Sequence, residues 1–146
     1  MNPCPCGFYG SKEKECTCSN AAISKYMGKI SGPLLDRIDI CIEVSPVKYE
    51  KLDSAEKIES SAEIKARVNK ARKIQYERYK NSKILSNAEL TPKLIDEFCK
   101  LDEKGKRILE EAFNRLKLSA RAYGRILKVA RTIADLETSA NIEVKH

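Results

Sequence analysis

The chain has 146 residues, of which 42% are hydrophobic and 34% charged, and its formal net charge at neutral pH is +7. This composition fits one domain, or a small domain with an appendage, and it excludes a membrane span because no apolar run is long enough. Without a secretory signal we expect a cytoplasmic protein with six reduced or metal-bound cysteines, and the positive charge favours a polyanionic partner such as nucleic acid or nucleotide phosphate.

The first twenty residues contain two Cys-x-Cys pairs, Cys4 with Cys6 and Cys16 with Cys18. Four thiolates from two short arms can close a tetrahedral zinc site, which would order a loop too polar to order itself. The usual spacing is Cys-x2-Cys, so free thiols or adventitious disulfides are the alternative. A closed four-thiolate site has no open position, and we therefore assign it a structural role.

Residues 19 to 30 predict a short helix that Ser19 or Asn20 can cap. After a turn at Gly32-Pro33, the sequence predicts an apolar anchor at Leu34-Leu35 and a β-branched strand over residues 38 to 44 with at least one buried face.

Arg37 lies between this anchor and this strand. On a short rigid segment, its guanidinium can project toward a phosphate or a carboxylate. Alternatively it pairs with Asp36, Asp39 or another surface carboxylate. Beyond the strand, residues 47 to 60 are charged and irregular, which is typical of a linker between two subdomains.

The rest of the chain predicts four amphipathic helices. The first opens with the capping box Ser60-x-x-Glu63 and runs to about Lys80 with Ile64, Val68, Ala71, Gln75 and Tyr79 at helical spacing; the others open at Thr91-Pro92, Asp102 and Ser119. Apolar stripes on helices with short connections must be buried against one another, so a small helical bundle is expected. Cys41 and Cys99 are read as small core residues.

The fourth helix also carries a polar face, formed by Arg121, Arg125, Lys128 and Thr132. A cation in the first helical turn is unfavourable to the helix dipole by a few tenths of a kcal/mol (~0.3) and asks for a compensating anion. The alternative is an ordinary exposed basic face. The last residues, 141 to 146, resemble the beginning of another helix.

Three sequence runs point to one family because they occur in its order: Met1-Asn2-Pro3, Ser31-Gly32-Pro33-Leu34-Leu35-Asp36-Arg37-Ile38-Asp39 and Leu118-Ser119-Ala120-Arg121. They resemble the second half of the ATPase core and the lid of magnesium-chelatase-like AAA+ proteins, and the cysteines resemble the ComM/YifB branch. The resemblance implies a mainly α fold, a four-helix lid bundle preceded by a Cys-rich loop and one core β-strand. The implied domains are a core remnant over 1–46, a linker over 47–60 and a helical lid over 61–146.

The resemblance also implies roles for single residues. Arg37 matches the arginine finger that one subunit inserts into its neighbour's ATP site. Asn2 matches sensor 1, which orients the attacking water near the γ-phosphate. Arg121 matches sensor 2, with Arg125 as the reserve candidate.

The sequence has no Gly-x4-Gly-Lys-[Ser/Thr] loop and no apolar strand ending in acidic residues for Mg²⁺, and His146 is its only histidine. We therefore expect no ATP hydrolysis by this chain alone. The resemblance implies a full-length homo-oligomer, a hexameric ring that uses ATP and Mg²⁺ for work on DNA such as branch migration. The alternative function is a non-enzymatic, zinc-stapled basic helical module that binds nucleic acid or a protein partner.

Overall fold

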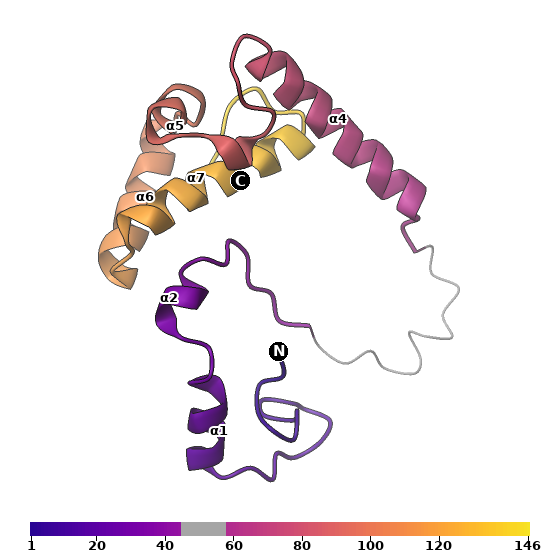
Figure 1. Ribbon diagram of the computed structural model, residues 1–146, viewed down its shortest axis with the longest axis vertical. Coiled ribbons are helices and arrows are strands. Elements are labelled where there is room, and N and C mark those ends of the chain that lie inside the picture. Colours follow the sequence, from indigo (N-terminus) through magenta and orange to yellow (C-terminus); the bar gives the residue numbers. More distant parts are fainter. Residues whose placement is uncertain (45–57) are drawn as a thin grey trace. The chain divides into compact units, whose positions relative to one another are not determined.

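The computed structural model describes residues 1–44 and 58–146 (Figure 1), and these residues belong to two separate compact units divided between Ala55 and Glu56. The described residues are mainly helical, which confirms the expected fold class. Of the linker expected over residues 47–60, only 58–60 lie inside the described part of the chain.

Within residues 1–44, the first unit contains a Cys-rich loop and two short helices, α1 (Asn20–Met27) and α2 (Gly32–Leu35). Helix α1 begins where the sequence predicts, because the Ser19 hydroxyl accepts the Ala22 N–H at 3.3 Å. The segment predicted as a turn at Gly32-Pro33 is instead a single helical turn, in which proline occupies an early position that needs no N–H donor.

The β-strand expected over residues 38–44 does not form. Ile42 and Val44 are 79% and 80% exposed. A strand needs a neighbour for its backbone donors and acceptors, and the described residues place none beside this segment. The expected anchor at Leu34-Leu35 and the core position of Cys41 are also wrong, since all three side chains are exposed.

The second unit contains the four predicted helices and a short 3₁₀ helix. Their bounds are α4 (Ser61–Tyr79), η1 (Asn87–Glu89), α5 (Pro92–Phe98), α6 (Glu103–Leu116) and α7 (Ala120–Leu136). All four α-helices begin directly after the residues predicted as caps. Ser60, Asp102 and Ser119 each accept a backbone N–H at the helix start, whereas Thr91 makes no side-chain cap bond and α5 begins with the proline that follows it.

The core of this unit is built around α7, which packs against α4, α5 and η1. Its buried members are Tyr79, Leu90, Ile95, Cys99, Leu127, Ala130, Ala134 and Ile142. The Tyr79 and Phe98 rings meet edge to face with centroids 5.3 Å apart. Burial of Cys99 confirms its prediction as a core residue.

Several predicted stripe residues are not covered. Ile64 and Val68 at the start of α4 are 42% and 43% exposed, and Tyr123 on α7 is 42% exposed. An open apolar cavity of about 450 Å³ lies between α6 and the start of α7, lined by Leu101, Lys106, Leu109, Glu110, Phe113, Ala120 and Tyr123. Helical periodicity thus identifies the apolar faces but not which of them the described residues bury.

The chain after α7 does not form the expected helix. Thr138 adopts a left-handed conformation with φ 59°, and the Ser139 N–H donates to the Ala134 carbonyl at 2.8 Å, which closes the end of α7. The chain then turns back so that Ile142 forms a parallel bridge with Leu101 and is 4% exposed. Burial of Ile142 against the core therefore takes precedence over local helix propensity.

Candidate functional site

The four cysteine side chains predicted as metal ligands come together in the first unit. Their sulfur atoms all lie within 4.8 Å of one another. The Sγ of Cys4 lies 3.4 Å from that of Cys6 and 3.7 Å from that of Cys16, and Cys6 and Cys16 are 3.6 Å apart. The two short arms of the loop thus bring both Cys-x-Cys pairs to one point.

Backbone turns hold the first arm in place. The Gly7 N–H donates to the Cys4 carbonyl at 3.0 Å, and Gly7 has φ +84°, a left-handed conformation that glycine adopts without strain. The next turn directs the Tyr9 N–H onto the Cys4 sulfur at 3.3 Å. Lys14 lies over the Phe8 ring at 4.6 Å and covers the loop from outside.

The sulfur positions fit a zinc ion. A tetrahedral site with Zn–S bonds of about 2.3 Å requires sulfur atoms about 3.8 Å apart. The separations among Cys4, Cys6 and Cys16, 3.4 to 3.7 Å, are close to that value, and the Cys18 sulfur lies within 4.8 Å of the other three. Four thiolates are also a donor set that suits a closed structural zinc site.

The thiols influence one another's ionisation. The backbone N–H of Phe8 is the main cause that lowers the pKa of Cys6 to about 6. The backbone N–H of Cys18 also acts to lower the pKa of Cys16, but burial and the neighbouring thiols outweigh it and raise that pKa to about 12. A first thiolate makes the next one costly, and a central divalent cation would remove that cost.

Asn2, predicted as sensor 1, lies beside this loop. A Cβ placed on Gly7 would stand 3.8 Å from the Asn2 side-chain nitrogen, so the two residues are close neighbours. Asn2 itself is exposed. Its amide therefore lies near the turn that follows Cys4.

Arg37, predicted as the arginine finger, follows the end of α2. Its backbone N–H donates to the Leu34 carbonyl at 3.0 Å, and its Nη1 donates to the Pro33 carbonyl at 2.6 Å. The side chain is exposed. The guanidinium thus rests against the carbonyl end of a helical turn, where a cation is electrostatically favoured.

The two sensor-2 candidates lie on α7 of the other unit. Arg121 stands in its first turn and is exposed, whereas Arg125, one turn later, is half-buried. Part of the polar face predicted from Arg121 to Thr132 makes contacts within the helical unit. Lys128 donates to the Ala88 carbonyl at 2.9 Å, and Thr132 accepts from Asn87 at 3.0 Å, because this face packs against η1.

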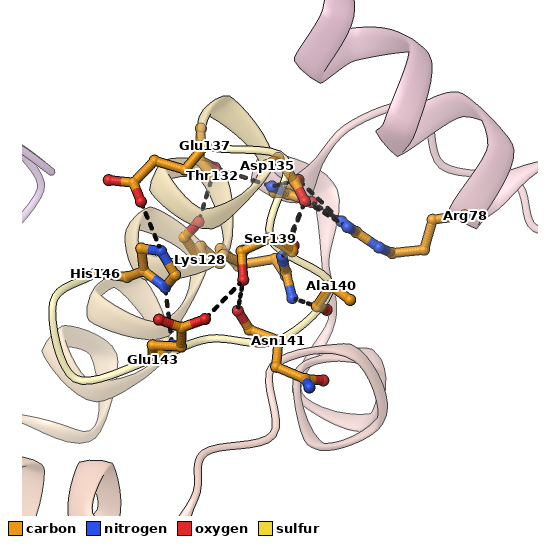
Figure 2. Close-up of polar contacts among 12 residues, drawn as sticks. Arg78, Lys128, Thr132, Asp135, Glu137, Ser139, Ala140, Asn141, Glu143 and His146 are labelled. Carbon is orange, nitrogen blue, oxygen red and sulfur yellow. Dashed lines mark hydrogen bonds and ion pairs between the residues drawn. The ribbon is translucent and has the colours of Figure 1, made fainter.

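Sequence reasoning missed a buried ionic network at the other end of α7 (Figure 2). Asp135 is fully buried and accepts a two-pronged contact from Arg78 of α4, through Nη1 at 2.9 Å and through Nη2. Arg131, 3% exposed, donates its Nε to the same carboxylate at 3.2 Å. One acid therefore serves two arginines from two helices.

Each remaining polar group in the network also has a partner. Arg131 donates to the Ser139 and Ala140 carbonyls at 2.7 and 2.9 Å. Buried Asn87 donates to Asp135 at 2.9 Å and accepts the Tyr79 hydroxyl at 2.6 Å. The sequence held one signal of this, since Arg131 and Asp135 stand four residues apart and can pair on a helix.

No helix within residues 1–44 and 58–146 combines the length and the hydropathy needed to cross a bilayer. Residues 58–146 match the family described as magnesium chelatase, subunit ChlI C-terminal, and residues 1–52 match magnesium chelatase, subunit ChlI. The two matches together leave only a short stretch of the chain outside.

Curated relatives match along the whole chain. Competence protein ComM of Haemophilus influenzae is 44% identical over 147 aligned residues, which cover 100% of this chain and 28% of that protein. Protein YifB of Salmonella typhimurium is 40% identical, with the same coverage of both chains. A Mycobacterium bovis protein, Mb2921c, is 33% identical over 97% of this chain. The chain thus spans little more than a quarter of the length of these relatives.

Proposed function

The chain belongs to the magnesium-chelatase-like proteins, in their ComM/YifB branch, and from this membership we propose that it forms part of an AAA+ ATPase ring. In this proposal it contributes the arginine finger, sensor 1, sensor 2 and the lid to nucleotide sites completed by other polypeptide segments. ATP with Mg²⁺ is the substrate, and the oligomer is a homomeric ring of six subunits.

Arg37 is the proposed arginine finger. The observation that supports it best is its place in the Leu-Leu-Asp-Arg motif together with an exposed guanidinium whose contact is a neutral carbonyl. Exchange of that carbonyl for a phosphate oxygen would strengthen the hydrogen bond, because both partners would then carry charge. The planar fork would stabilise the charge that develops on the transferred phosphoryl group.

Asn2 and the start of α7 are the proposed sensors. Asn2 would orient the attacking water, and Arg121, or Arg125 one turn later, would contact the γ-phosphate and couple its loss to movement of the lid. Cys4, Cys6, Cys16 and Cys18 would hold a structural Zn²⁺. The ion would fix the four thiolates at one point and would thereby keep the segment around Asn2 in one conformation.

DNA is the proposed object of the work. The branch-migration role follows the resemblance to the ComM/YifB branch, and a relative with 44% identity carries the name Competence protein ComM. Residues 58–146 contain 20 lysines and arginines against 13 aspartates and glutamates, so this part accounts for the whole excess of seven positive charges. We infer that the ring moves along or branch-migrates DNA and that the helical unit faces it with a favourable potential.

The ATPase proposal is tested by exchanging the matching segment of Haemophilus influenzae ComM for this chain. We expect the chimera to hydrolyse ATP and Arg37→Ala to lower kcat on the order of a thousandfold, as loss of an arginine finger does. Arg107→Ala, which removes an exposed arginine of α6, is the matched control and should leave kcat unchanged. An active Arg37→Ala chimera would refute the finger assignment.

A further inference from the structure

Helix α4 carries a basic face, and the proposed function assigns no role to any of its residues. Lys65, Asn69, Arg72, Lys73, Tyr76 and Lys80 recur at intervals of three and four residues, and this set is called the basic stripe below. Residues so spaced share about 100° of a helix surface. All acidic residues of α4 lie outside that arc.

The basic stripe is open to solvent. All six of its residues are exposed, and Tyr76 is 61% exposed. Residues 61 to 70 are exposed on every side, and Figure 1 shows the first half of α4 extending beyond the other helices of its unit. An extended molecule can therefore lie along this helix without displacing any part of the unit.

The charge of the basic stripe is poorly compensated within the protein. Lys65, Arg72 and Lys73 form no ion pair among the described residues, and Lys80 reaches only Glu77, at 3.6 Å and with both side chains more than half exposed. Arg67 and Arg78, the other arginines of α4, are paired with Glu59 and Asp135 and point elsewhere. The acidic residues of the unit thus leave most of the positive charge of the basic stripe without a counter-charge.

We propose that the basic stripe binds single-stranded nucleic acid, with phosphates on Lys65, Arg72, Lys73 and Lys80 and a base stacked on Tyr76. The inference rests on the proposed function for its choice of nucleic acid as partner. From Lys65 to Lys80 the helix rises about 22 Å, which corresponds to about six phosphate spacings of one strand at about 3.4 Å each. Four cations in a row with one exposed ring reproduce the cation-and-stacking arrangement of single-strand binding surfaces.

The exposed ring distinguishes this partner from others. An acidic peptide or a duplex backbone would use the cations but would leave the Tyr76 face without a planar group to cover. A single strand supplies both a phosphate for each cation and an unstacked base for the ring. Asn69, between the cations, adds a neutral donor and acceptor for a sugar or base edge.

The test uses the 146-residue chain and fluorescence anisotropy of a labelled 20-nucleotide single strand, without ATP. The triple variant Lys65→Gln, Arg72→Gln, Lys73→Gln is compared with a control that loses the same charges elsewhere on the unit: Lys93→Gln, Lys104→Gln and Arg107→Gln, all exposed. Circular dichroism verifies that both keep their helices.

We expect the stripe variant to bind at least tenfold more weakly at about 0.1 M salt and to lower the slope of log K against log salt by about 2, since each phosphate contact contributes about 0.7. The control should change the slope by less than about 0.5. Equal losses in both variants would overturn the proposal, because they would mean that only total charge matters. Equal displacement of the strand by polyglutamate would overturn it in favour of an acidic protein partner.

The Tyr76→Leu variant tests base stacking separately from electrostatic binding, because it removes the ring and changes no charge. Loss of one stacked base should weaken binding about tenfold and leave the salt slope unchanged. With a strand carrying abasic sites throughout, wild type and Tyr76→Leu should bind alike, whereas a difference there would contradict stacking. These measurements need no ring and no nucleotide, so binding can succeed while the ATPase test fails, or the reverse.

Discussion

Asp135 joins three parts of the helical unit through one carboxylate. It is fully buried, and its two oxygens accept from Arg78 of α4, Arg131 of α7 and the Asn87 amide. An isolated buried charge is costly, and even a paired one adds little compared with an apolar core. The network therefore serves to fix one arrangement of α4 against α7, because only that arrangement leaves no charge without a partner.

We expect Asp135→Asn to lower the free energy of unfolding of the helical unit by about 3 kcal/mol. The amide keeps the shape of the side chain but leaves two guanidinium groups near one another without their counter-charge. Urea denaturation followed by circular dichroism at neutral pH measures the loss. Asp96→Asn, at an exposed position of α5, is the control, and a similar loss there would contradict the assigned role.

The same residue predicts how stability depends on pH. Burial alone would raise the pKa of Asp135, but the hydrogen bonds from Arg78 and Asn87 outweigh it and lower that pKa below its usual value. A depressed folded-state pKa gives stability that is present above the unfolded pKa of about 3.9 and is lost as pH falls through the folded pKa. The unfolding free energy should thus decline below about pH 4.

Urea titrations between pH 3 and pH 7 measure this decline, and the comparison of wild type with Asp135→Asn isolates the contribution of one carboxyl. The slope at acid pH should be shallower in the variant, which has no proton to gain at this position. Parallel curves for the two proteins would show that other carboxylates, not Asp135, govern acid unfolding.

At the scale of elements, local chemistry predicted the helices well and the strand poorly. Ser60, Asp102 and Ser119 accept backbone N–H groups at the helix starts where the sequence predicts them as caps. This interaction needs only neighbouring residues. The strand over 38–44 depends on a partner strand, which the sequence of the segment does not encode. The prediction that the apolar face of α4 is buried depends in the same way on distant residues. It is correct at Tyr79, which packs in the core, and wrong at Ile64, which is exposed.

The capping box at the start of α4 has a measurable local effect. The Glu63 N–H donates to the Ser60 hydroxyl at 3.3 Å, and the Ser60 N–H donates to the Glu63 carboxylate at 2.7 Å. Ser60→Ala should destabilise the first turns by about 1 kcal/mol, because residues 61–70 have no tertiary burial to compensate.

Amide hydrogen exchange measures this effect residue by residue. The amides of the first two turns of α4 should exchange about fivefold faster in Ser60→Ala, with the later turns unchanged. Ser61→Ala changes a neighbouring serine inside the helix and should not accelerate exchange. Faster exchange throughout α4 would instead mean that its two halves unfold together.

At the scale of the whole molecule, the two units depend on different kinds of interaction. The helical unit has a hydrophobic core whose members all lie between residues 79 and 142. Among the described residues of the first unit, Cys4 is the one side chain that is buried. A segment with so little buried apolar surface gains too little to offset its conformational entropy, and the proposed Zn²⁺ would supply the missing stabilisation. The cysteine spacing predicted that the four thiols come together, whereas the Asp135 network was recoverable only from the fold.

We therefore expect the chain to bind one equivalent of Zn²⁺ and its removal by a chelator to affect one unit only. In amide NMR spectra, signals of residues 1–44 should collapse toward random-coil positions, whereas the thermal midpoint of the helical unit should stay unchanged, because no member of its core contributes to the cluster. The Cys16→Ser variant should bind zinc at least tenfold more weakly, as is typical when a residue that supports a metal site is replaced. The control variant Cys41→Ser changes an exposed cysteine outside the cluster and should bind zinc like wild type. A chelator-dependent midpoint for residues 58–146 would mean that the zinc loop also supports the lid, and zinc binding that survives Cys16→Ser would mean that the four thiols are not its ligands.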